Sequence, residues 1–139
     1  DMPLSLEDLL KDRFVQWPEV IGGIVIAVNI EGVDAKQMVL DGKTVANIYL
    51  GKIKKWNDPA IASANPDVKL PADEIVVVHR SDGSGTSFVF TDYLSKVSPD
   101  WAAGPGKGSA INWPVGRGRG AGSASWPITA PRSPAGTAM

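Results

Sequence analysis

The apolar residues of the first thirty positions follow two different patterns. From Leu6 to Leu10 they stand at i, i+3 and i+4, so residues 5–11 are expected to form a helix with Ser5 as its N-cap. Residues 24–30 form a nearly continuous apolar run, which is typical of a strand buried on both faces. The pattern therefore predicts a helix followed by a central strand.

Further along the chain, helices and strands are expected to alternate. Residues 41–51 carry their apolar side chains on one stripe, and Gly51 is expected to end that helix. Asp58 and Pro59 supply the cap and the first-turn proline of a second short helix. Residues 75–78 have the length and composition of a buried strand, and another helix begins soon after them. This alternation predicts an α/β sheet.

Composition narrows the classes of function. The formal net charge of −1 gives no reason to expect nucleic acid or an acidic membrane surface as a partner. No apolar run reaches membrane-spanning length, so insertion into a membrane is not expected either. With no cysteine and a single histidine, the chain has almost nothing from which to build a zinc site. No metal and no cofactor is predicted.

The composition changes near residue 115. Every acidic residue lies at or before Asp100, whereas residues 116–139 consist mainly of glycine, alanine, proline, serine and arginine. This last stretch has neither a helical nor a strand period. We therefore expect a partial domain over residues 1–115 and a divergent, low-complexity, poorly ordered tail over residues 116–139.

The segment between the expected strand at residues 75–78 and the following helix has the parts of an anion site. Gly83 and Gly85 allow the backbone to approach a ligand closely, and Ser84 and Thr86 offer hydroxyl groups. The first N–H groups of a helix lack intrahelical partners and favour negative charge. Arg80 adds a planar fork suited to two oxygens of a tetrahedral anion. The competing interpretation is an ordinary strand–turn–helix junction with Ser84 as N-cap.

Two catalytic or nucleotide-binding interpretations fail on single positions. The triplet at residues 42–44 resembles the end of a P-loop, but Gln37 stands where that motif requires glycine. Around Ser84, Asp82 occupies the position where a nucleophile elbow requires glycine. His79, the only histidine, stands at a strand end and is expected to be structural or to support a neighbouring ligand residue.

Residues 82–94, DGSGTSFVFTDYL, closely resemble the signature of the periplasmic phosphate-binding proteins of Pst-type ABC importers. The likeness covers residue 1 to about residue 116 without an obvious gap. It runs through the segments DMPL at residues 1–4, VIGGI at 20–24, LDGKT at 40–44, YLGKIKKW at 49–56 and INWP at 111–114. On these motifs the chain is identified as an internal fragment of this family.

The resemblance implies a fold, a ligand and a partner. The fold would be part of a two-lobed, type II periplasmic-binding-protein clamshell of the α/β class, incomplete in this chain. The function would be to capture inorganic phosphate, with arsenate as its mimic, and to deliver it to an ABC permease of the inner membrane without catalysis. The location would be periplasmic or otherwise extracytoplasmic.

The resemblance also implies the site residues. The phosphate ligands would be Asp1, Arg80, Ser84, Gly85 and Thr86. Asp82 would hold Arg80 in place by an ion pair. Asp1 would accept the proton of the bound phosphate, which gives selectivity because sulfate has no proton to offer to a carboxylate.

Two other functions remain open at this point. The chain could be a phosphate-ester hydrolase that uses Ser84 as nucleophile, which would require a base or a metal beside it. It could instead be a truncated paralogue without binding activity, since the family has ligand loops before Asp1 and more sheet after residue 116. The tail would then come from a shifted reading frame or an internal deletion. Because a clamshell needs both lobes, the isolated chain is expected to bind phosphate weakly or not at all.

Overall fold

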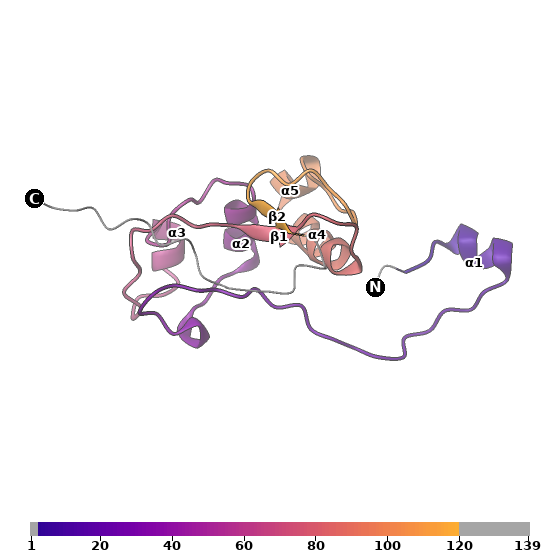
Figure 1. Cartoon of the computed structure of the whole chain (residues 1–139), viewed down its shortest axis with the longest axis horizontal. Helices are drawn as coiled ribbons and strands as arrows, with labels where there is room; N and C mark the ends of the chain where they lie inside the picture. The colour runs from indigo at the N-terminus through magenta and orange to yellow at the C-terminus, as the bar shows by residue number, and fades with distance from the viewer. Residues whose placement is uncertain (1–2, 120–139) are drawn as a thin grey trace, which may run out of the picture.

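A computed structural model describes residues 3–119 of the chain. Its elements, in chain order, are α1 (Leu6–Asp12), η1 (Ala35–Gln37), α2 (Gly42–Tyr49), α3 (Pro59–Ala62), β1 (Val78–Arg80), α4 (Gly85–Val97), α5 (Pro99–Ala103) and β2 (Arg117–Arg119). Helices α2 to α5 and the two strands form one body, and α1 stands away from it at the end of an extended arm (Figure 1).

Helix α1 forms where the sequence predicts it. The Ser5 hydroxyl accepts a hydrogen bond from the Asp8 backbone N–H at 3.1 Å, which confirms Ser5 as the N-cap. Arg13 ends the helix in the left-handed conformation, with φ of 54°. None of the residues of α1 is buried, so this helix depends on local interactions alone.

The prediction of a strand at residues 24–30 is wrong. These residues form neither helix nor strand, and Ile30 is the only buried residue among them. Val25, for example, is 85% exposed. A strand buried on both faces needs neighbouring strands to pair with its backbone, and within residues 3–119 the sheet consists of β1 and β2 alone. The apolar run therefore lies extended along the arm that leads from α1 (Figure 1).

Helix α2 confirms the helix expected at residues 41–51. The Asp41 carboxylate accepts the backbone N–H of Thr44 at 2.6 Å, and Gly51 follows the helix with a φ of 72°. This hydrogen bond from the Thr44 backbone lowers the pKa of Asp41. On its inner face α2 contributes Val45 and Ala46 to a core completed by Leu94 of α4 and Trp101 of α5.

We expect Asp41→Ala to destabilise the chain by about 1 kcal/mol at neutral pH, the usual cost of losing a helix cap. Because the folded-state pKa of Asp41 is lowered, its contribution is complete above its ordinary pKa of about 4 and is lost as pH falls through the folded value. Urea denaturation at pH 7 and near pH 3 measures both. Asp41→Asn, which keeps an uncharged cap, is the control. An Asp41→Ala deficit that persists unchanged at pH 3 would contradict the assignment.

A second core lies between α2, α3 and the strand end, and consists of Ile48, Ile53, Ile61 and Val77. Asp58 caps α3 and Pro59 occupies its first turn, as the sequence predicts. The segment that follows α3 contains a buried side-chain amide, that of Asn65.

The Asn65 side chain connects α3 to the segment before α2. Its NH₂ group donates to the carbonyl oxygens of Val39 and Ile61, each at 2.8 Å. Its carbonyl oxygen accepts the Val39 backbone N–H at 2.7 Å. Three of the hydrogen bonds that an amide side chain can form are therefore satisfied inside the fold.

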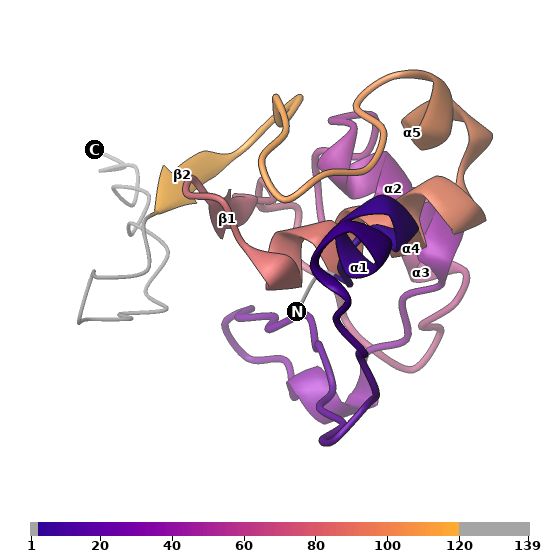
Figure 2. The ribbon, with the colours of Figure 1, turned by 90° about the vertical axis from the view of Figure 1, so that its right-hand side faces the viewer.

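The sheet is small and parallel. Strand β1 covers Val78–Arg80 instead of residues 75–78, and pairs with β2 in the register Val78↔Arg117 to Arg80↔Arg119. Pairing starts where Arg117 donates its N–H to the carbonyl of Val77, so the position of β2 decides where β1 begins. Figure 2 shows the pair beside the start of α4. Residues 117–119 belong to the expected tail, and the boundary near residue 115 stays a prediction because residues 120–139 lie outside the described ones.

The described part of the chain, residues 3–119, includes no helix that is both long and apolar enough to cross a membrane.

Candidate functional site

The candidate site is the junction between β1 and α4. Helix α4 begins at Gly85 and runs for 13 residues, and its N-cap residue, Ser84, has an extended backbone. The Ser84 backbone N–H donates to the carbonyl of Ser109 at 2.9 Å, which ties the junction to the loop before Trp113. The first N–H groups of α4 have no earlier helical turn to donate to, so they are available to an anion.

The Ser84 side chain is buried without a hydrogen-bond partner. Ser84 is 6% exposed, and its Oγ has no partner among the described residues. It occupies the N-cap position but does not cap α4, because its side chain makes no capping hydrogen bond. A buried hydroxyl without a partner costs free energy. A ligand oxygen at this point would remove that cost.

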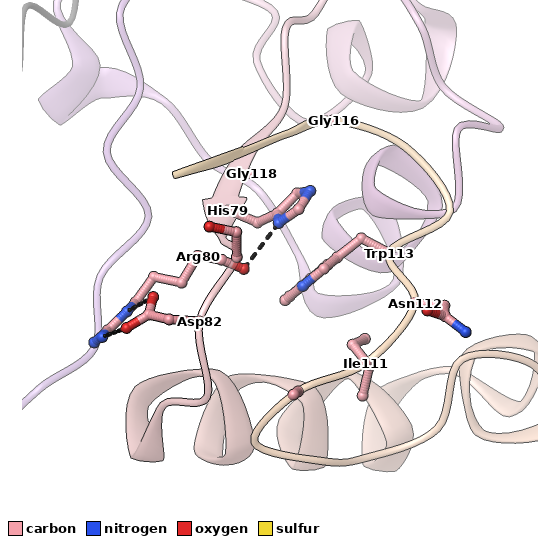
Figure 3. Close-up of a pocket in the computed structure, with 10 residues that line it drawn as sticks. His79, Arg80, Asp82, Ile111, Asn112, Trp113, Gly116 and Gly118 are labelled. Carbon is pink, nitrogen blue, oxygen red and sulfur yellow. Dashed lines mark hydrogen bonds and ion pairs between the residues drawn. The ribbon is translucent and has the colours of Figure 1, made fainter. Parts of the chain in front are cut away.

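Arg80 and Asp82 form the ion pair that the resemblance implies. The Arg80 Nε donates to one Asp82 carboxylate oxygen at 3.1 Å, and its Nη2 donates to the other at 2.5 Å. This bidentate hydrogen bond with Asp82 raises the pKa of Arg80. The two side chains point to the same side because they are two residues apart at the end of a strand, as Figure 3 shows. Three N–H groups of the guanidinium are not used by this contact.

The other predicted ligands follow in the chain, with one exception. Gly85 is half-buried at the first position of α4, and Thr86 is exposed at the second. Asp1 lies outside the described residues, so the structure does not locate it relative to Arg80. Four of the five predicted ligands therefore lie within one seven-residue stretch, and their roles stay predictions.

A cavity of about 330 Å³ opens next to this stretch (Figure 3). It is lined by residues of β1, the loop at 110–113 and β2, including Arg80 and Asp82. Ser84, Gly85 and Thr86 do not line it. The cavity and the start of α4 are therefore separate, and only the end of β1 is next to both.

The structure adds an aromatic contact that the sequence does not predict. The rings of His79 and Trp113 are stacked, with centroids 4.7 Å apart and an interplanar angle of 17°. The His79 Nδ1 lies 3.0 Å from the carbonyl oxygen of Arg80, to which its N–H can donate. His79 therefore supports the backbone of Arg80, in agreement with the supporting role expected for it. Trp113 is 34 positions away, and no local pattern points to it.

Comparison with known proteins places this junction in a family of binding proteins. Residues 5–130 match the family model described as a PBP superfamily domain, so the chain belongs to the PBP superfamily. The matched range extends beyond residue 116, where the likeness read from the sequence ends.

Among its relatives, the chain is 51% identical to the phosphate-binding protein PstS of Pasteurella multocida over 118 residues, which are 85% of this chain and 34% of the relative. It is 50% identical to PstS of Haemophilus influenzae over 118 residues, 85% of this chain and 35% of that protein. It is 45% identical to PstS of Methanocaldococcus jannaschii over 112 residues, 77% of this chain and 29% of that protein. The chain thus spans about a third of the length of these relatives. The family predicted from the sequence is confirmed, and so is an incomplete fold of the periplasmic-binding-protein class.

Proposed function

We propose that this chain is the part of a solute-binding protein that holds inorganic phosphate through the start of α4, for delivery to an ABC permease. The relatives are named phosphate-binding proteins, which supports binding as the activity and offers no support for catalysis. The proposed location is the periplasm or another extracytoplasmic space, where such a protein would collect its ligand.

The unpartnered hydroxyl of Ser84 carries this proposal. Among residues 3–119 this buried hydroxyl has no hydrogen-bond partner and does not cap its helix, and it lies at the start of α4, where the first N–H groups favour an anion. Arg80 lies four residues earlier, at the end of the strand, and its contact with Asp82 leaves three of its five guanidinium N–H groups unused. Donors without acceptors are what a dianion requires.

Asp1 would supply the discrimination between anions. A carboxylate can accept a hydrogen bond from the proton that phosphate or arsenate keeps near neutral pH. Sulfate has no such proton, so the carboxylate only repels it. This role depends on the segment before residue 3 and is a proposal from the family resemblance alone.

Hydrolysis of phosphate esters receives no support from the site. A serine nucleophile needs a base within hydrogen-bond reach, and Ser84 Oγ contacts no hydrogen-bonding group among the described residues. Asp82, the nearest carboxylate in sequence, is engaged by Arg80. Residues 3–119 also contain no cluster of three metal-binding side chains.

Phosphorus NMR of the full chain with millimolar phosphate tests the proposal. We expect a weak but saturable exchange broadening of the phosphate signal. Excess arsenate should remove it and excess sulfate should not, because phosphate and arsenate keep a proton near neutral pH and sulfate does not. Sulfate competing as well as arsenate would contradict the role of Asp1. No binding either by this chain or by a complete clamshell that carries its residues 1–115 would favour the truncated paralogue without binding activity. Release of phosphate from a phosphate ester would favour the hydrolase.

A further inference from the structure

The loop at residues 104–110, which follows α5, is held against α4 by a buried threonine. Its sequence is GPGKGSA, and its glycines give it little stiffness of its own. Its position is therefore determined by its contacts with other parts of the fold. Two side chains of α4, Thr91 and Asp92, form hydrogen bonds with this loop. Thr91 is fully buried, whereas the partner of Asp92 is the exposed side chain of Lys107.

The Thr91 hydroxyl contacts both backbone groups of Gly108. Its Oγ1 accepts the Gly108 N–H at 3.0 Å. The same oxygen lies 3.1 Å from the carbonyl oxygens of Gly108 and Phe88, either of which can accept its proton. One side chain therefore determines where this residue of the loop lies relative to α4.

The next residue of the loop holds Ser84. The Ser109 carbonyl oxygen accepts the Ser84 N–H at 2.9 Å, directly after Gly108 in the chain. The Ser84 hydroxyl is the buried group that has no hydrogen-bond partner among residues 3–119. A path of two hydrogen bonds and one peptide bond thus leads from Thr91, in the middle of α4, to the proposed phosphate donor at the start of that helix.

We propose that Thr91 is a positioning residue of the phosphate site. It holds the loop at 104–110 in place, so that Ser109 directs the Ser84 hydroxyl toward an anion at the start of α4. Thr91 itself does not contact the ligand. This inference rests on the proposed function. It goes beyond a role in the core, because a buried hydroxyl with satisfied hydrogen bonds adds little net stability over an apolar group of the same shape.

Amide hydrogen exchange of the full chain, followed by NMR, tests the path without phosphate. In the unchanged chain the Ser84 and Gly108 amide protons should exchange at similar rates, because release of the loop frees both. Thr91→Val should speed exchange of the Ser84 amide about tenfold or more, while the amide of Val45 in α2 changes by less than about twofold. Thr91→Ser keeps the hydroxyl and should keep the original rates.

Phosphate titration into a complete clamshell tests the effect on the site. Residues 1–115 replace the matching segment of the Pasteurella multocida protein for this purpose. We expect about fivefold weaker binding in Thr91→Val and unchanged binding in Thr91→Ser. On a Ser84→Ala background, Thr91→Val should add less than about twofold, because its effect passes through Ser84.

Thr44→Val is the matched control in this titration. Thr44 is also buried, but it lies in the first turn of α2. Its substitution can lower stability and should leave the phosphate affinity unchanged.

The role of Thr91 is refuted if Thr91→Val accelerates the Ser84 and Val45 amides equally, which is the result of a purely structural contribution. Full affinity in Thr91→Val, or an additive loss on the Ser84→Ala background, would refute it as well. Should Thr91→Val not fold, clearly different exchange rates of the Ser84 and Gly108 amides in the unchanged chain would overturn the path.

The controls separate this inference from the proposed function. If Arg80→Ala and Ser84→Ala weaken binding but Thr91→Val does not, the role of Thr91 alone is wrong. If Arg80→Ala and Ser84→Ala leave the affinity unchanged, the proposed site is wrong and the role of Thr91 falls with it.

Discussion

Removing the Arg80 guanidinium is expected to weaken phosphate binding more than any other change at the junction. Arg80→Ala removes the cation beside the Asp82 carboxylate, so that this negative charge faces the anion, and withdraws the donors that Asp82 now orients. We expect about a 30-fold or greater loss of affinity for Arg80→Ala, and about tenfold for Ser84→Ala, which removes a single hydrogen bond to a charged ligand.

The measurement requires a complete clamshell, because this chain spans about a third of its relatives. Residues 1–115 are therefore exchanged into the Pasteurella multocida protein, and phosphate is titrated calorimetrically into the chimera and its variants. Lys69→Ala removes a positive charge from an exposed position away from the junction and serves as the control. Equal and negligible effects of Arg80→Ala and Ser84→Ala would refute the assignment of the site.

The largest effect on stability is expected from Trp101→Ala. Trp101 is fully buried in the core between α2, α4 and α5, and its indole N–H donates to the carbonyl of Gly106 at 2.8 Å. The substitution leaves a large cavity and an unpaired carbonyl, which together cost about 3–5 kcal/mol and can exceed the stability of so small a core.

Thermal and urea denaturation followed by circular dichroism measure this loss. Trp17→Ala is the matched control, since Trp17 is 70% exposed on the arm, and it should change stability by no more than about 0.5 kcal/mol. Trp101→Phe should fall between the two, because it keeps most apolar contacts but donates no hydrogen bond. Similar losses from Trp101→Ala and Trp17→Ala would show that the helical core does not form as described.

The sequence predicts the helices well because their ends are determined by neighbouring residues. Ser5, Asp41 and Asp58 each cap the helix that starts after them, and the cap is a contact across two or three positions. The strands depend on distant partners. Residues 24–30 have the composition of a buried strand but no strand to pair with among residues 3–119, and β1 begins where it pairs with Arg117.

The candidate site shows the same division. The Arg80–Asp82 contact joins residues two apart and could be expected from the motif. The burial of Ser84 could not, because it depends on the loop at Ser109, and the stacking of His79 on Trp113 joins segments that no local pattern connects. Contacts between residues close in sequence can be predicted from the sequence. The burial of the site residues cannot, because it depends on segments that meet only in the folded chain.

The contacts of Asn65 have a consequence for how the body opens. Val39 lies outside every helix and strand, yet its amide proton is held by the Asn65 side chain at 2.7 Å, and the same side chain holds Ile61 of α3. Exchange of that proton with solvent water must wait until Asn65 releases it. The Val39 amide should therefore exchange on the timescale of the unfolding of α3 rather than that of a loop. A single side chain thereby makes an irregular segment part of the cooperative unit that contains the helix.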